Sequence, residues 1–110
     1  MSASVRSLGA AGLEAALAEP RPLLVDFWAP WCGPCRMMAP AFEAAAEALQ
    51  GQVRFAKVNT DEEPGLAARF AVRAVPTLIL FEGGREARRV SGVLDAGSLL
   101  RWLQQAAQPA

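Results

Sequence analysis

The chain has 110 residues, 53% of them hydrophobic, which is enough for one domain spanning residues 1–110. Eleven basic and eleven acidic residues give a formal net charge of zero, and no basic stripe predicts binding to nucleic acid or to an anionic membrane. No run of about eighteen apolar residues predicts a transmembrane helix, so we expect no membrane span.

The N-terminal segment 1–18 has one feature of a secretion signal, because Ala16-Leu17-Ala18 resembles a cleavage site. Its apolar run is short and is interrupted by Glu14, so an amphipathic helix explains it better. We therefore expect a cytoplasmic protein, in a compartment that keeps thiols reduced unless they cycle.

Apolar runs and turn residues predict nine elements in the order β-α-β-α-β-α-β-β-α. They are a strand at 3–7, a helix at 8–19, a strand at 23–28, a helix at 34–49, a strand at 53–58, a helix at 62–70 capped by Asp61 or Thr60, strands at 77–81 and 86–91, and a last helix capped by Asp95. The run 23–28 lacks alternation, which is typical of a central strand covered on both faces. The order indicates an α/β fold with a mixed sheet between two helical layers.

Two helices show the spacing of a buried face. In the helix at 34–49 the expected stripe is Cys35, Ala39, Phe42, Ala46 and Leu49, and in the last helix it is Leu99, Leu103 and Ala106. Pro40 lies inside the first of these helices, where proline removes a hydrogen bond and is expected to bend the helix.

The only two cysteines, Cys32 and Cys35, lie where the apolar strand 23–28 leads into a helix. The amides and the dipole of a helix N-terminus favour an anion, so a thiolate here should have a lowered pKa. Cys32 precedes the helix, and we expect it to be the more exposed cysteine and the nucleophile. Cys35 lies one turn inside and is expected to resolve the mixed disulfide.

Two other interpretations of the cysteine pair are weaker. A zinc site needs about four ligands, whereas the chain has no histidine and no second cysteine pair, so we expect no metal. A structural disulfide over two intervening residues closes almost no loop and gains little stability. The spacing near a βαβ pattern favours a redox-active pair.

Asp26 is the anomaly of the apolar strand, because a buried carboxylate is costly unless it is paired or protonated. Lys57, within a second apolar strand, is its natural partner. A structural ion pair and a titrating functional pair both remain open at this point.

The segment 25–35, VDFWAPWCGPC, resembles the signature of the thioredoxin family. Further hallmark positions are Pro40, Lys57, Val75-Pro76-Thr77, Gly84 and Gly92. The segment 35–40, CRMMAP, is most similar to the bacterial thioredoxin-2 branch, although this chain carries no four-cysteine zinc-binding segment. Arg36 and Ala74 depart from the commonest pattern of the family.

The resemblance implies the thioredoxin fold, a central mixed five-stranded sheet flanked by four helices. It also implies that Asp26 accepts a proton from Cys35, that Lys57 tunes Asp26, and that Pro76 is cis and shields the dithiol. The flat apolar surface that it implies for substrate binding consists of Trp31, Gly33, Pro34, Ala74, Val75, Gly92 and Val93.

The function implied by the resemblance is reduction of protein disulfides as an electron donor in cell redox homeostasis. No cofactor is expected to be bound, and the Cys32–Cys35 disulfide would be reduced by NADPH through thioredoxin reductase. The expected partners are that reductase and disulfide-containing client proteins, and the expected state is a monomer. Two alternatives remain open: an exported, dedicated thiol reductant, and a non-catalytic binding or chaperone module.

Overall fold

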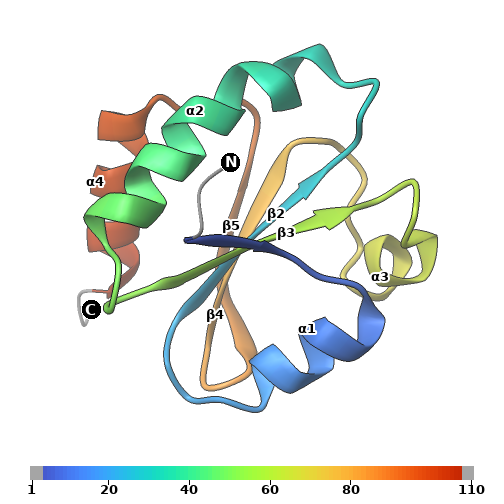
Figure 1. Ribbon diagram of the computed structural model, residues 1–110, viewed down its shortest axis with the longest axis horizontal. Coiled ribbons are helices and arrows are strands. Elements are labelled where there is room, and N and C mark those ends of the chain that lie inside the picture. The colour runs from blue at the N-terminus through green and yellow to red at the C-terminus, as the bar shows by residue number, and fades with distance from the viewer. Residues whose placement is uncertain (1–3, 108–110) are drawn as a thin grey trace.

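The computed structural model describes residues 4–107, which form one five-stranded sheet between two layers of helices (Figure 1). The strands are β1 (Val5–Ser7), β2 (Leu23–Trp28), β3 (Arg54–Asn59), β4 (Thr77–Glu82) and β5 (Arg85–Ser91). The helices are α1 (Ala10–Leu17), α2 (Gly33–Ala48), α3 (Pro64–Arg69) and α4 (Ala96–Ala107). The element order and the mixed sheet with four helices confirm the predicted fold.

The strand order β1-β3-β2-β4-β5 places β2 at the centre of the sheet. β1, β3 and β2 run parallel, and β4 and β5 are antiparallel to their neighbours. Every residue of β2 except Trp28 is buried, which confirms the central strand expected from its unbroken apolar run. The register pairs Asp26 with Lys57 on β3 and with Leu78 on β4.

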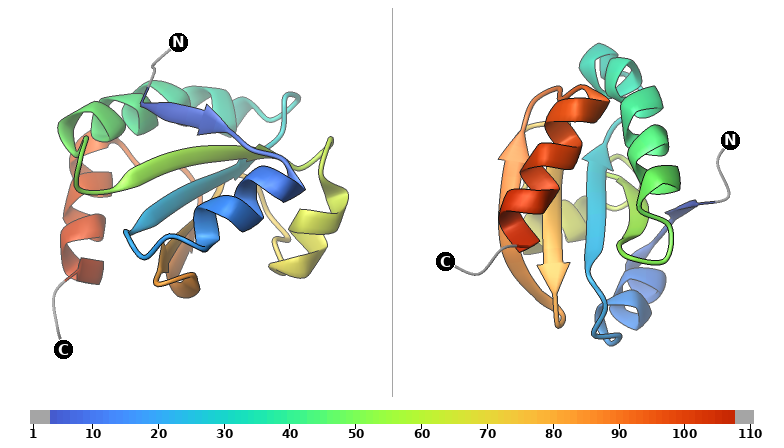
Figure 2. Two further views of the ribbon diagram at one scale, coloured as in Figure 1. Left: turned by 60° about the horizontal axis from the view of Figure 1, so that its bottom comes forward. Right: turned by 90° about the vertical axis from the view of Figure 1, so that its left-hand side faces the viewer.

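The two faces of the sheet carry separate apolar cores, because side chains of a strand alternate between faces. α1 and α3 cover one face, where Leu13 and Leu66 pack with Val25 and Phe27 of β2. α2 and α4 cover the other face, where Phe42 and Leu99 pack with Leu24. Figure 2 shows α2 and α4 together on one side of the sheet.

The core faces of the helices differ from the sequence prediction in detail. In α2 the buried residues are Cys35, Met38, Phe42, Ala45 and Ala46, whereas Ala39 and Leu49 are only partly buried. Leu49 nevertheless packs against the core of this face, so the predicted stripe was wrong only at Ala39, because an alanine-rich helix gives little contrast between neighbouring faces. In α4, Leu99 and Leu103 are buried as predicted, and the side chain of Ala106 lies outside the described residues.

The caps of the last two helices show one prediction that was wrong and one that is confirmed. Neither Asp61 nor Thr60 caps α3, whose N-cap is Glu63 and has no side-chain hydrogen bond. The Asn59 side chain accepts the backbone N–H groups of Asp61 and Glu62 at 2.9 and 3.3 Å in the turn before the helix. Asp95 Oδ1 accepts the Ser98 N–H at 2.8 Å at the start of α4. That hydrogen bond lowers the pKa of Asp95 below its ordinary value.

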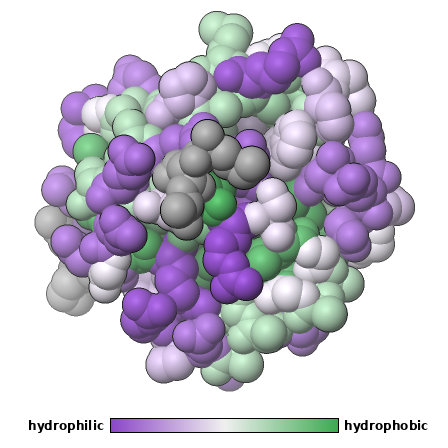
Figure 3. Space-filling model, viewed as in Figure 1, coloured by the Kyte–Doolittle hydropathy of each residue, from purple (hydrophilic) through white to green (hydrophobic). Residues whose placement is uncertain are grey.

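The surface of the described residues 4–107 is mixed in character. Hydrophilic and hydrophobic residues are interspersed over the face seen in Figure 3. The large apolar side chains that remain exposed are Trp31, Met37 and Val93. No helix of this part of the chain is both long and apolar enough to cross a bilayer.

Candidate active site

The two cysteines lie at the N-terminus of α2, just beyond the carboxyl end of β2. Cys32 is the N-cap of the helix, and its Sγ accepts the Cys35 backbone N–H at 3.1 Å. The two residues form a disulfide, with their Cα atoms 5.3 Å apart. An N-cap acceptor satisfies an amide that the helix itself leaves unpaired. In the dithiol form the same amide and the helix dipole favour negative charge on the Cys32 sulfur.

The expected difference in exposure between the cysteines is wrong for the disulfide form, because both side chains are 3% exposed. Cys32 is covered because it packs with Ala29, Trp28 and Val75, and its Sγ lies 3.6 Å from the Val75 carbonyl oxygen. Trp28 packs against this cluster from the end of β2. The cysteines differ instead in what they face, because only Cys32 lines the groove beside the disulfide.

This groove, which we call the dithiol groove, has a volume of about 550 Å³ and a mainly apolar lining. Its lining residues are Trp31, Cys32, Gly33, Pro34, Thr60, Ala67, Val72, Arg73, Ala74 and Val75. Trp31 is 69% exposed, and its indole N–H donates to Asp61 Oδ1 at 3.2 Å. An open apolar groove of this kind suits an extended peptide better than an enclosed small molecule.

The dithiol groove contains five of the seven residues predicted to bind substrate. Gly92 and Val93 are exposed but lie outside its lining. Sequence reasoning missed Thr60, Ala67, Val72 and Arg73, which come from β3's end, α3 and the loop after it. Thr60 had a usable signal, because it follows the carboxyl end of a strand parallel to β2, the edge where α/β sheets bind ligands.

The loop that faces Cys32 is fixed by hydrogen bonds from both sides. The Val75–Pro76 peptide bond is cis, as predicted, and Pro76 is buried. The Thr77 hydroxyl donates to the Ala74 carbonyl at 2.5 Å, and the Gly92 N–H donates to the Pro76 carbonyl at 3.0 Å. The backbone of Val75 is therefore held beside the sulfur of Cys32, although Gly92 itself lies outside the groove.

Asp26 is 1% exposed, and its buried Oδ1 has no hydrogen-bond partner. Alternation along β2 puts Asp26 on the same face as Leu24, which packs with α2, the helix that carries Cys35. Desolvation by burial raises the pKa of Asp26 to about 7, and the charge of Lys57 partly opposes this. The Asp26 carboxyl can therefore take up or release a proton near neutral pH.

Lys57 does not form the expected contact with Asp26, although the two residues are register partners. Among residues 4–107 no ion pair joins them within 4.0 Å. The Lys57 ammonium lies instead over the Trp28 ring, 4.7 Å from its centroid. The structural ion pair is thus excluded in this structure, and Lys57 acts on Asp26 only through its longer-range charge.

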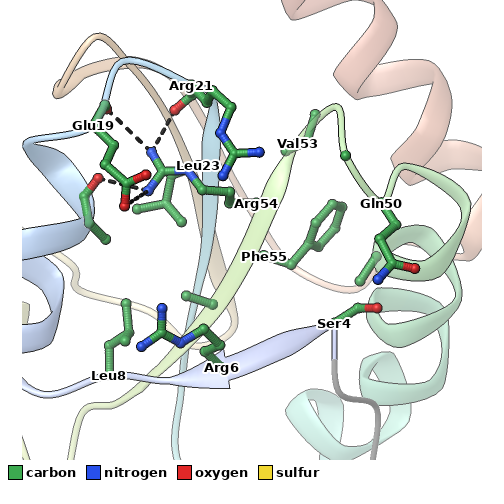
Figure 4. Close-up of a pocket in the computed structure, with 14 residues that line it drawn as sticks. Ser4, Arg6, Leu8, Glu19, Arg21, Leu23, Gln50, Val53, Arg54 and Phe55 are labelled. Atoms are coloured by element: carbon green, nitrogen blue, oxygen red, sulfur yellow. Dashed lines mark hydrogen bonds and ion pairs between the residues drawn. The ribbon is translucent and has the colours of Figure 1, made fainter.

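A second hollow, of about 280 Å³, lies at the opposite end of the sheet (Figure 4). Arg54 lines this hollow, and its hydrogen bonds connect the end of α1 to the segment before β2. Its guanidinium donates to the carbonyls of Ala16, Glu19 and Arg21 at 2.9, 3.3 and 2.6 Å, and pairs with the Glu19 carboxylate at 3.5 Å. The Ala16 carbonyl, in the last turn of α1, also accepts the Glu19 N–H at 3.3 Å, whereas the carbonyls of Glu19 and Arg21 belong to the connection between α1 and β2.

A metal centre finds no support in the described part of the chain, where no three His, Cys, Asp or Glu side chains come together.

Comparison with known proteins agrees with this arrangement. The family model described as thioredoxin matches residues 4–105. A thioredoxin of Synechocystis sp. is 41% identical over 105 residues, which are 96% of this chain and 98% of that protein. The chain belongs to the thioredoxin family. A thioredoxin of Alicyclobacillus acidocaldarius is 50% identical over 82 residues, covering 74% of this chain and 78% of that protein.

The fold comparison gives the same result. The crystal structure of chloroplastic thioredoxin z matches with a TM-score of 0.85 and 33% identity, covering 96% of each chain. Thioredoxins are protein-disulfide oxidoreductases, and this member carries the cysteine pair of that reaction at the N-terminus of α2. The protein is therefore a thiol–disulfide oxidoreductase.

Proposed function

We propose that this thioredoxin works as a reductant of disulfides in client proteins, with Cys32 as the attacking cysteine. The observation that carries the proposal is that the dithiol groove reaches Cys32 and not Cys35. Cys32 also accepts the Cys35 amide at the helix N-terminus, which favours its thiolate form. A client strand lying in the groove would pair with the backbone at Val75 and meet the Cys32 sulfur first.

The reaction transfers two electrons in two exchanges. The Cys32 thiolate attacks one sulfur of the client disulfide, a mixed disulfide forms, and the other client sulfur leaves as a thiolate. Cys35 loses its proton to Asp26, and its thiolate attacks the Cys32 sulfur. The Cys32–Cys35 disulfide forms, and the second client sulfur leaves and is protonated. Pro76 is proposed to shield the pair from other ligands, and the Lys57 charge to limit how far the pKa of Asp26 rises.

The recharging step is proposed to use a thioredoxin reductase with NADPH, and the working compartment to be the cytoplasm. No bound cofactor is needed in this scheme, and the protein would act as a monomer in cell redox homeostasis. The segment 35–40 supports an assignment to the thioredoxin-2 branch, which a phylogeny of the family would test. An exported, dedicated reductant would differ in its partner protein and would be found outside the cytoplasm on cell fractionation.

Insulin reduction with NADPH and a thioredoxin reductase tests the proposal. The wild type should consume NADPH and precipitate the insulin B chain, whereas Cys32→Ser should do neither. Cys35→Ser should accumulate mixed disulfides with client proteins, detected by mass spectrometry, and Cys32→Ser should not. Equal trapping by the two variants would contradict the assigned roles. Full biological activity of a variant lacking both cysteines would favour the binding-module alternative.

A further inference from the structure

The dithiol groove has one charged residue in its lining, Arg73. Arg73 lies two residues before Val75, the residue whose carbonyl oxygen is 3.6 Å from Cys32 Sγ. The other lining residues are uncharged except for Cys32 in its thiolate form, so Arg73 is the one cationic side chain of the lining.

Arg73 is exposed and has no hydrogen bond, ion pair or ring contact within residues 4–107. Its neighbours in the fold are engaged. Arg69 pairs with Glu14 and stacks on Phe70 at 4.8 Å, and Arg89 pairs with Glu86 at 2.6 Å. The guanidinium of Arg73 is therefore the one left available at the groove.

Asp61, which contacts Trp31 of the groove lining, forms no ion pair with Arg73 within 4.0 Å. Asp61 Oδ1 accepts the Trp31 indole N–H at 3.2 Å, which holds that carboxylate at the Trp31 side of the opening. A client strand thus meets an apolar floor, the Cys32 sulfur, and a cation on the side of the Ala74–Val75 loop.

We infer that Arg73 is a specificity-determining residue that selects client disulfides carrying a carboxylate close to the reacting cysteine. Side chains two positions apart on an extended strand project from the same face, about 7 Å apart. A client strand paired with the Val75 backbone would accordingly present a residue two positions from its cysteine to Arg73. A Glu or Asp at that position forms a charge-assisted, bidentate hydrogen bond with the guanidinium. This inference rests on the proposed reductase function and names a substrate class for the same groove.

Single-turnover reduction of two matched peptide disulfides tests it. The peptides are identical except for Glu or Gln two positions from the cysteine, on either side, and the protein is reduced beforehand so that no reductase takes part. The wild type should reduce the Glu peptide about threefold faster, as expected for an exposed ion pair, and the ratio should shrink as salt is added.

The variants separate charge recognition from fold. Arg73→Gln should bring the ratio of the two rates to about one, and Arg73→Lys should keep most of it. Arg73→Glu should invert the preference towards a peptide with Lys at the same position. Arg85→Gln, which removes an exposed arginine outside the groove, should leave the ratio unchanged. Equal rates for both peptides in the wild type, or a ratio that survives Arg73→Gln, would overturn the inference and leave the reductase function standing. Failure of the wild type to reduce either peptide would overturn the reductase function, and this inference with it.

Discussion

Two charged residues of neighbouring strands, the partly buried Arg54 and the fully buried Asp26, differ in how far the fold satisfies their polar atoms. Arg54, at the start of β3, keeps 17% of its side chain exposed; its two terminal nitrogens donate to three backbone carbonyls and the Glu19 carboxylate, whereas its buried Nε has no hydrogen-bond partner. Asp26, in the middle of β2, is 1% exposed and has a carboxylate oxygen without a partner. Buried charges are normally paired or hydrogen-bonded.

Arg54 and Asp26 lie in parts of the molecule that serve different purposes. At the end away from the cysteines, Arg54 joins α1 to β2 and serves the stability of the fold. On the face of α2, Asp26 carries an electrostatic penalty that shows as a pKa raised to about 7. Uncompensated titrating groups of this kind cluster at functional sites. The following predictions test this difference between Asp26 and Arg54.

The largest expected effect is the change in the pH dependence of unfolding free energy in Asp26→Asn. The folded protein holds the Asp26 proton more tightly than the unfolded chain does, because the pKa rises from 3.8 to about 7. Wild-type stability should therefore fall as the pH rises between these two values, by about 4 kcal/mol in all. Urea unfolding from about pH 4 to about pH 8 should show this slope in the wild type and lose it in Asp26→Asn, which should be the more stable protein above pH 7.

The same variant should reduce disulfides at least about tenfold more slowly, because the proton acceptor for Cys35 is gone. Insulin turnover at a pH where both proteins are folded measures this. A variant that is less stable than the wild type at high pH and turns over insulin normally would show that Asp26 is only a structural residue.

The next effect is the loss of the Arg54 network. Arg54→Met keeps the aliphatic packing but removes the guanidinium donor from the carbonyls of Glu19 and Arg21 and one of two donors from the Ala16 carbonyl, so we expect a loss of about 3 kcal/mol in unfolding free energy. Insulin reduction per folded molecule should not change. Arg85→Met, at an exposed position of β5, is the control and should lose less than about 0.5 kcal/mol. Equal stability of Arg54→Met and Arg85→Met would show that the hydrogen bonds of Arg54 do not stabilise the fold.

The smallest effect concerns Lys57. Lys57→Met removes the charge that lowers the pKa of Asp26, so that pKa should rise further and the pH range of falling stability should extend upward. The direct loss should be about 1 kcal/mol or less, because the contact of Lys57 with the Trp28 ring is partly exposed. An unchanged pH profile in denaturant unfolding would show that Lys57 does not act on Asp26.

The sequence predicted the centre of this molecule better than its edges. β2 was correct to the residue, because its apolar run is bounded by prolines and a turn, and the disulfide-forming pair followed from its spacing. The stabilising role of Arg54 could not be predicted, because an arginine beginning a strand has the sequence pattern of an exposed polar residue. Nor could the extent of the groove, because Ala67 and Val72 come near Cys32 only through the tertiary fold.

The pairing of Asp26 with Lys57 shows how far a strand register can be used. The two residues are opposite each other in the parallel ladder, as expected. Their side chains nevertheless do not meet, because the Lys57 ammonium lies on the Trp28 ring. A strand register fixes the positions of Cα atoms, whereas the end of a long side chain can contact any of several partners within its reach.

Direct titration of the Asp26 carboxyl tests whether this residue is unpartnered and titrates near neutral pH. The ¹³C chemical shift of that carboxyl carbon would be followed by NMR against pH in the oxidised protein, with Asp26→Asn used to assign the signal. An unpartnered, desolvated carboxyl should titrate with a midpoint near 7. A midpoint at or below the ordinary value of 3.8 would show that Asp26 is paired in solution, and would contradict the contrast with Arg54.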